Sequence, residues 1–448
     1  MKFPKSGSDT PRIIRSLTGL SLAVMAFGTL FSTYLQQDYT ETISWPVEDG
    51  WCEYGTQGFG IHCFGDFYAP ASVAADSNPW GNEQLRLAYT PLSLAYFRLL
   101  NSSIFLNLGS QVPLILNFLL TIIAFLTPGL YIWMNQSKFP GISGKWIGLI
   151  SLTAAPSLMM IDRGNNSFLL YPTIFFFFLG LQRQNIKLAS YSLVIMGIWK
   201  PQTLILSLGI LIFLGLRPFL VTGIKFVVLF ALSFLLYPVG ILGNLTDWFQ
   251  NSRGYQNYAP NPSPGNYSFV GFIGYINGFK NLAVERFGSF QDAFIPLTPN
   301  FVTLFCTFYA LTIATLFTIA RHSITKLQFM LHSSVFLVTT PGTTFGYYLA
   351  LMLIPLLLIT PNQLNNALQS LENKILWMLY LLLLVVAVPA WPLNWFNLRL
   401  DVGDAFTKLG VQWTIVHMLI GLLVLVSLSQ LLILAAGRNK IKRIHEHH

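Results

Sequence analysis

Residues 112–134 read VPLILNFLLTIIAFLTPGLYIWM, a run of 23 residues without one charged side chain. About 20 apolar residues in a helix cross the hydrocarbon core of a bilayer, so this run predicts a membrane-spanning helix. In the whole 448-residue chain, 53% of the residues are hydrophobic and 10% are charged. Soluble domains carry about 25% charged residues. The composition therefore predicts an all-α polytopic membrane protein, with residues 1–448 forming one integral membrane domain in a lipid bilayer.

Further apolar segments lie on both sides of this run. The complete set is expected at about 16–34, 88–108, 112–134, 146–161, 167–182, 188–199, 202–216, 219–243, 299–320, 327–340, 343–360, 374–391 and 412–436. We interpret the first segment as an uncleaved anchor.

The net charge of +9 comes from short basic clusters at both chain ends and between apolar segments, for example at Arg183, Arg217 and Arg321. Cytoplasmic loops gather Lys and Arg, so both termini are expected in the cytoplasm and the number of spans should be even. One of the 13 segments, between residues 88 and 145, is then not a span, which leaves about 12 transmembrane helices. This charge pattern favours membrane topology over nucleic-acid binding.

Two polar stretches interrupt the apolar pattern, and both are expected on the external side. Residues 36–87 hold eight of the 17 acidic residues of the chain, and residues 244–298 are rich in Asn, Pro, Gly and Tyr. Long loops in membrane proteins and compact domains are usually functional, so we expect 36–87 to be a structured first external loop. Cys52 and Cys63 lie in this loop, and the sequence leaves open whether they form a disulfide.

Five polar constellations are expected on this external side. They are Asp66-Phe67-Tyr68 with the later Tyr89, Asp162-Arg163-Gly164-Asn165-Asn166-Ser167, Trp199-Lys200-Pro201, Gly265-Asn266-Tyr267-Ser268, and Pro341–Thr344 leading to Tyr347-Tyr348. Each has a simple structural interpretation. Asp66 and Asn266 could be turn residues, Arg163 could pair locally with Asp162, Lys200 could be a snorkelling anchor, and the Tyr pair could belong to an interfacial aromatic belt.

Together these residues have the chemistry for sugar transfer from a phosphate-linked donor. A carboxylate such as Asp66 can take the proton from an acceptor hydroxyl. Lys200 or Arg163 can neutralise a departing lipid phosphate. Aromatic and amide side chains at Tyr68, Tyr89, Asn165, Asn266, Tyr347 and Tyr348 suit binding of the sugar substrates.

The order Asp-Phe-Tyr, Asn-Pro-Trp (residues 78–80), Tyr-Thr-Pro-Leu (residues 89–92) resembles the first-loop signature of glycosyltransferase family 87, a bacterial family with the multi-span GT-C fold. The resemblance continues in order through Arg163-Gly164-Asn165, Lys200-Pro201 and Gly265–Ser268 to Pro341–Pro355. The family includes polyprenol-phosphate-mannose-dependent α-mannosyltransferases. One departure is that the His pair often found in this group is replaced here by Tyr347-Tyr348.

The resemblance implies a GT-C-type glycosyltransferase in a bacterial plasma membrane, with its active site on the external face. Asp66 maps to the family's loop aspartate and becomes the expected general base, with inversion at the anomeric carbon. Lys200 maps to the cation near the donor phosphate, and Arg163 is a second candidate for that role. The expected partners are a polyprenyl-phosphate sugar donor and a lipid-linked glycan acceptor, and the donor sugar is expected to be mannose.

Two alternatives stay open. The missing His pair makes decaprenyl-phosphate-arabinofuranose a possible donor, so the enzyme could be an arabinofuranosyltransferase. A transporter or flippase of lipid-linked sugars would need a similar groove, but it should place ionisable residues inside the spans, where the sequence pattern did not lead us to expect any. No metal and no other cofactor are expected, because Asp66 has no Asp-x-Asp partner and the His residues are scattered.

Overall fold

The computed structural model describes residues 15–23, 26, 65–81, 88–258, 268–273, 276, 299–341, 346–358, 399–400 and 409–445. These residues are predominantly helical, with one short antiparallel pair of strands, β1 (Arg399–Leu400) and β2 (Leu409–Gly410). Most of the predicted loop 36–87, much of 244–298, the predicted span 374–391, and the residues Cys52, Cys63 and Asn266 lie outside the described residues.

The run quoted first forms the helix α6 (Val112–Met134), which packs against α7 (Gly144–Thr153). The two backbones touch at glycines: a Cβ on Gly129 would lie 2.5 Å from the backbone nitrogen of Gly148. Small residues let helices approach closely where no water drives them together. The chain then continues through α8 (Ala155–Arg163) and η5 (Asn166–Leu169).

A helical hairpin forms the centre of the molecule. Its arms are α9 (Leu170–Gln182) and α10 (Ile186–Trp199), which are in contact along their length. The Phe-rich arm α9 buries Phe175, Phe177 and Phe178 completely. The next elements are η6 (Pro201–Leu206), α11 (Ser207–Phe213), α12 (Leu216–Ser233) and η7 (Phe234–Leu236).

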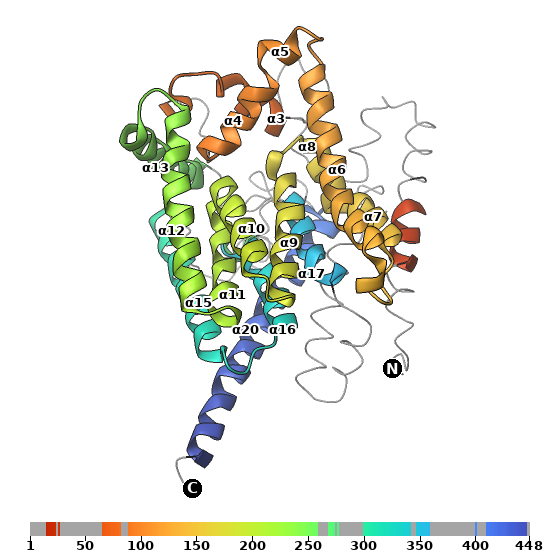
Figure 1. The fold of residues 1–448 in the computed structure, drawn as a ribbon, viewed down its shortest axis with the longest axis vertical. Coiled ribbons are helices and arrows are strands. Elements are labelled where there is room, and N and C mark those ends of the chain that lie inside the picture. Colours follow the sequence, from red (N-terminus) through yellow and green to blue (C-terminus); the bar gives the residue numbers. More distant parts are fainter. Residues whose placement is uncertain are drawn as a thin grey trace.

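The C-terminal half adds further helices around this hairpin (Figure 1). They are α15 (Pro299–Ala320), α16 (Lys326–Thr339), η8 (Gly346–Met352), α17 (Leu353–Leu357) and α20 (Val411–His445). The helix α20 packs on α15 and α16 and then extends beyond the other helices at the lower end of Figure 1.

The predicted segment 88–108 is not one helix. It divides into α4 (Pro91–Leu100) and the four-residue α5 (Ser103–Leu106). A helix of 10 residues is about 15 Å long, which is too short to cross the hydrocarbon core by itself. The predicted segment 219–243 was also wrong in its boundaries, because the helix ends near Leu236, and α13 (Ile241–Tyr258) begins before residue 243 and continues into the predicted second loop.

Four helices of the described part are long and apolar enough to cross a membrane: Val112–Met134, Leu216–Leu236, Asn300–Ala320 and Val416–Ala436. Three shorter apolar helices, Asn166–Gln182, Ile186–Trp199 and Pro201–Phe213, pack among them. The chain is therefore a membrane protein whose described part is helical apart from the short strand pair. The count of about 12 spans stays a prediction.

The bundle has two chemically different ends. At one, which we call the capped end, α3 (Gly65–Val73), α4, α5 and α13 lie across the tops of the long helices (Figure 1). Asn117, near the start of α6, donates to the Gly164 carbonyl at this end. At the other, the basic end, Arg183 donates to the hydroxyl of Tyr131 near the end of α6, and Lys326 donates to the Gln182 carbonyl.

Candidate functional site

Asp66 lies in the first turn of α3, the described helix of the predicted first external loop. Its neighbour Phe67 is 1% exposed and packs edge-to-face on Tyr68 and on Phe97 of α4. Phe67 therefore anchors α3 on α4. Since Phe67 points into this aromatic cluster, the adjacent Asp66 carboxylate is directed elsewhere, toward the end of α8.

The end of α8 presents the groups that meet this carboxylate. The helix ends at Arg163, and Gly164 follows with φ 63°, a left-handed conformation that glycine adopts without a steric penalty. This turn brings Arg163 and Asn165 to the same side. Asn165 then caps η5, because its side-chain oxygen accepts from the backbone N–H of Ser167 at 2.8 Å.

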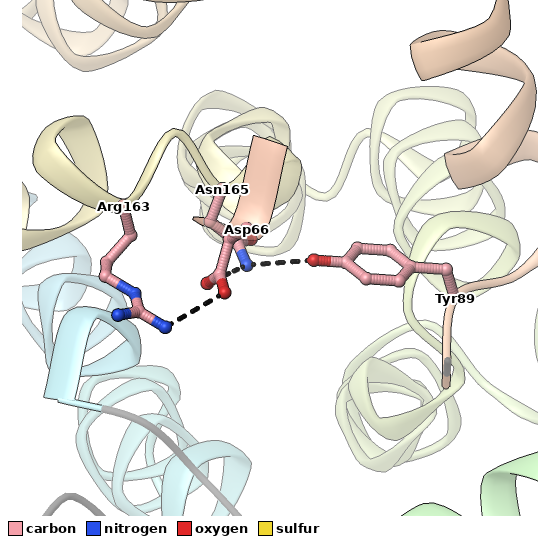
Figure 2. Close-up of polar contacts among 4 residues, drawn as sticks. All are labelled: Asp66, Tyr89, Arg163 and Asn165. Carbon is pink, nitrogen blue, oxygen red and sulfur yellow. Dashed lines mark hydrogen bonds and ion pairs between the residues drawn. The ribbon is translucent and has the colours of Figure 1, made fainter. Parts of the chain in front are cut away.

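Three side chains converge on one another here (Figure 2). Nη2 of Arg163 donates to Oδ1 of Asp66 at 3.1 Å, and Nδ2 of Asn165 donates to Oδ2 at 2.9 Å. The same Asn165 nitrogen donates to the hydroxyl of Tyr89 at 3.3 Å. The side chains of Arg163 and Asp66 are 13% and 18% exposed, so the pair is only partly accessible to solvent. Both carboxylate oxygens are held by donors from a segment nearly 100 residues away.

Lys200 reaches the same group through Tyr89. Its Nζ lies 4.3 Å from the centre of the Tyr89 ring, a favourable position for a cation over an aromatic face. Trp199 fixes the backbone beside it, because its indole donates to the Asn166 carbonyl and its own carbonyl accepts from Thr90. Among the residues that the structure describes, no carboxylate lies within ion-pair distance of the Lys200 ammonium.

The other residues predicted to bind substrate are Tyr348, Tyr68, Tyr347 and Asn266. Tyr348 is 6% exposed, and its hydroxyl shares a hydrogen bond of 3.0 Å with that of Ser167, which places it behind the Asn165 turn. Tyr68 is partly buried, and this burial raises the pKa of its phenol. The side chain of Tyr347 and the whole of Asn266 lie outside the described residues. Arg163 and Asn165 are thus the predicted residues that contact Asp66, and Tyr89 and Lys200 are linked to them through Asn165.

Several supporting residues were missed by the sequence reasoning. Asn117 accepts from the Tyr96 hydroxyl at 2.7 Å and donates to the Gly164 carbonyl at 3.1 Å, so it supports the left-handed turn from α6. Ser93 on α4 was missed as well: its hydroxyl and carbonyl accept from Asn166, a residue of the predicted constellation. An isolated Asn inside the apolar run 112–134 was the available signal, because a polar group in a membrane helix needs a partner.

The site combines one carboxylate with two cations, Arg163 and Lys200. Within the described residues, no group of three or more His, Cys, Asp or Glu side chains could hold a metal ion. The carboxylate can accept a proton, and the two cations can attract an anion such as a phosphate. The chemistry that fits best is a reaction between a hydroxyl group and a phosphate-bearing substrate.

Scans of the chain against protein-family models and against curated proteins gave no match. The resemblance to glycosyltransferase family 87 therefore rests on the sequence motifs alone. A function has to be argued from the chemistry of the Asp66 site and from the membrane character of the fold.

Proposed function

We propose that the protein is a membrane-embedded glycosyltransferase that moves a sugar from a polyprenyl-phosphate donor to a lipid-linked glycan acceptor. The observation that carries this proposal is the convergence of Asp66, Arg163, Asn165 and Lys200 at the capped end of an apolar bundle. These groups come from three segments that are far apart in the chain. A lipid-borne substrate would reach them from the bilayer, where the long helices expose their apolar faces.

Asp66 is the proposed general base. An ionised carboxylate has about four acceptor positions, and Arg163 and Asn165 use one on each oxygen. Positions remain on the carboxylate for an acceptor hydroxyl to donate to. A base must come within hydrogen-bond reach of the proton that it takes, and the partial exposure of Asp66 allows that approach. One base on one face supports direct displacement with inversion at the anomeric carbon.

The two cations have separate proposed roles. Arg163 is engaged with Asp66, so its main proposed role is to hold the base in place. Lys200 carries three N–H donors and lies over the Tyr89 ring. The ammonium can therefore hold the departing lipid phosphate and neutralise the charge that develops on it. The sequence analysis gave phosphate binding to both residues, and the geometry favours Lys200.

The distribution of charge supports an external active site. Arg183, Lys187 and Lys326 gather at the basic end, and Asp66 lies at the capped end. Since basic residues are retained on the cytoplasmic side of membranes, the proposed orientation puts both termini in the cytoplasm and Asp66 on the external face of a bacterial plasma membrane. The GT-C-type arrangement with about 12 spans belongs to this same proposal.

A transporter of lipid-linked sugars is the second candidate, and one observation favours it. His332 on α16 is completely buried against α20, beside Gln430. Ionisable side chains in such positions often mark transport pathways.

A transfer assay tests the enzyme proposal. The purified protein would receive radiolabelled polyprenyl-phosphate-mannose, then decaprenyl-phosphate-arabinofuranose, with a membrane lipid extract as the acceptor. Transfer of one sugar that falls at least about 100-fold in Asp66→Asn supports Asp66 as the base. Asp76→Asn is the matched control, because Asp76 is an exposed carboxylate of the same loop and should leave transfer unchanged.

Equal transfer by wild type and Asp66→Asn would overturn the assignment of the base. Vesicles that move the labelled donor across the bilayer without transferring its sugar would favour the transporter. In that case, His332→Ala should stop the movement, whereas Asp66→Asn should stop it only if the carboxylate contacts the passing headgroup.

A further inference from the structure

Residues 164–246 contain no Asp and no Glu, although they contain three lysines and two arginines. This stretch forms α9, α10, α11 and α12. A lysine on these helices therefore has no carboxylate partner on its own helix or on the other helices of this stretch. One of the three, Lys200, belongs to the Asp66 site.

Lys225 is the one of these lysines that lies inside a long apolar helix. It belongs to the candidate span Leu216–Leu236. Its neighbours on the outer surface are apolar and exposed: Leu220, Val221, Ile224, Val227 and Val228. A charged side chain on a lipid-facing surface is costly unless it reaches the bilayer surface or meets an opposite charge. Lys225 therefore requires either a path to the surface or an anionic partner.

The side chain of Lys225 reaches toward α10. Its Nζ lies 4.6 Å from the centre of the Tyr191 ring, and Tyr191 is 55% exposed. The two helices are joined beside this contact by a hydrogen bond of 2.6 Å between the hydroxyls of Ser190 and Thr222. Thr222 precedes Lys225 by about one helical turn, and Tyr191 is the neighbour of Ser190. The ammonium at the Tyr191 ring therefore lies nearer the basic end than the Lys225 backbone does.

Lys187 adds a second cation on the same face. It is exposed and precedes Tyr191 by four residues on α10, which puts the two side chains on one stripe of that helix. Ile195 continues the stripe away from the basic end and is 50% exposed. The outer face of the α10–α12 pair thus carries two ammonium groups and a phenol near the basic end, followed by an apolar strip.

We propose that this face binds an anionic phospholipid from the leaflet at the basic end. The headgroup phosphate lies between Lys225 and Lys187, where it accepts from both ammonium groups. The Tyr191 hydroxyl donates to it or to the ester oxygens. One acyl chain follows the exposed strip formed by Ile195 and Val228. Charge complementarity selects an anion, and the apolar strip selects a lipid rather than a soluble phosphate.

Native mass spectrometry of the full-length protein in a neutral detergent tests this site. The protein would be titrated with phosphatidylglycerol and with phosphatidylcholine of the same acyl chains. The wild type should bind phosphatidylglycerol more tightly, and Lys225→Met should weaken that binding by about fivefold, the loss expected for one lysine at a membrane surface. Lys225→Arg should keep the preference, because it keeps the charge.

Lys138→Met is the matched control, because Lys138 is exposed at the turn after α6 and belongs to a different face. It should bind both lipids as the wild type does. A wild type that does not distinguish the two lipids, or a Lys225→Met variant that retains the preference, would overturn the proposal. Full competition by soluble glycerol phosphate would also overturn it, since it would make the occupant a free phosphate.

Discussion

The side-chain nitrogen of Asn165 lies 2.9 Å from Oδ2 of Asp66, although 99 residues separate the two along the chain. The side-chain oxygen of Asn165 is occupied by the Ser167 backbone N–H, so the amide cannot rotate by 180° without losing both contacts. Asn165 was predicted to bind substrate, and that role stays a prediction. Its contacts with Asp66 and Ser167 also allow it to position the carboxylate.

Asn165→Ala should therefore lower the turnover number by about 100-fold, the cost expected when a reacting group is displaced by about 1 Å. The KM for the donor should change much less, since Lys200 is untouched. Steady-state kinetics of sugar transfer would measure both. Asn185→Ala is the matched control, because Asn185 caps α10 by the same type of hydrogen bond but lies at the basic end. A similar loss of turnover in both variants would identify a general effect on folding.

Arg163→Met should lower both activity and thermal stability. It leaves the largely buried Asp66 carboxylate without its ion-pair partner, and a hydrogen bond to a charged group contributes about 1.5–3 kcal/mol. A double-mutant cycle with Asp66→Asn, read from melting temperatures in detergent, isolates the contribution of the pair. If the two substitutions are additive, the ion pair does not stabilise the folded protein.

Lys200→Met should raise the KM for the polyprenyl-phosphate donor by about tenfold, because one charged contact to the phosphate is lost. Lys200→Arg should restore most of the binding. Tyr89→Phe keeps the ring beneath the ammonium and removes the hydroxyl that accepts from Asn165. We therefore expect Tyr89→Phe to reduce turnover more than donor affinity. If Tyr89→Phe reduced donor affinity more than turnover, the Tyr89 hydroxyl would not act through Asn165 and Asp66.

Gly144→Ala should destabilise the packing of α6 on α7, because the new Cβ would lie 2.5 Å from the backbone nitrogen of Trp133. Gly223→Ala in α12 is the control: a Cβ there meets nothing within 4 Å, and alanine favours a helix by about 1 kcal/mol over glycine. Melting temperatures should fall in the first variant and stay constant or rise in the second. A stable Gly144→Ala variant would mean that the two helices can separate at little cost.

The sequence predicted the membrane class and most of the helices because apolar runs and charge-free stretches are local properties of the chain. It failed to predict the break at Asn101 and Ser102 between α4 and α5, although it did predict that one segment between residues 88 and 145 is not a span. It also failed at 219–243, where the helix stops before Tyr237. Helix length depends on such local breaks and on packing, which an apolar average does not record.

The candidate site was predicted in part. Asp66, Arg163, Asn165 and Lys200 were expected on one side of the membrane, and the structure brings all four into one network. The sequence did not predict that Arg163 pairs with Asp66, at 3.1 Å between Nη2 and Oδ1. Long-range pairing of this kind depends on how α3 lies over α8, and no sequence spacing encodes it.

The path between Asp66 and Arg163 runs along α6 to the basic end and returns through α7 and α8. The two charges can meet only if α3 and the end of α8 lie on the same side of the bilayer. A chain in which α6 crosses the bilayer but the return through α7 and α8 does not would hold the carboxylate and the guanidinium on opposite sides of the bilayer. The ion pair therefore forms only after correct insertion, and a misinserted chain would lack this contact.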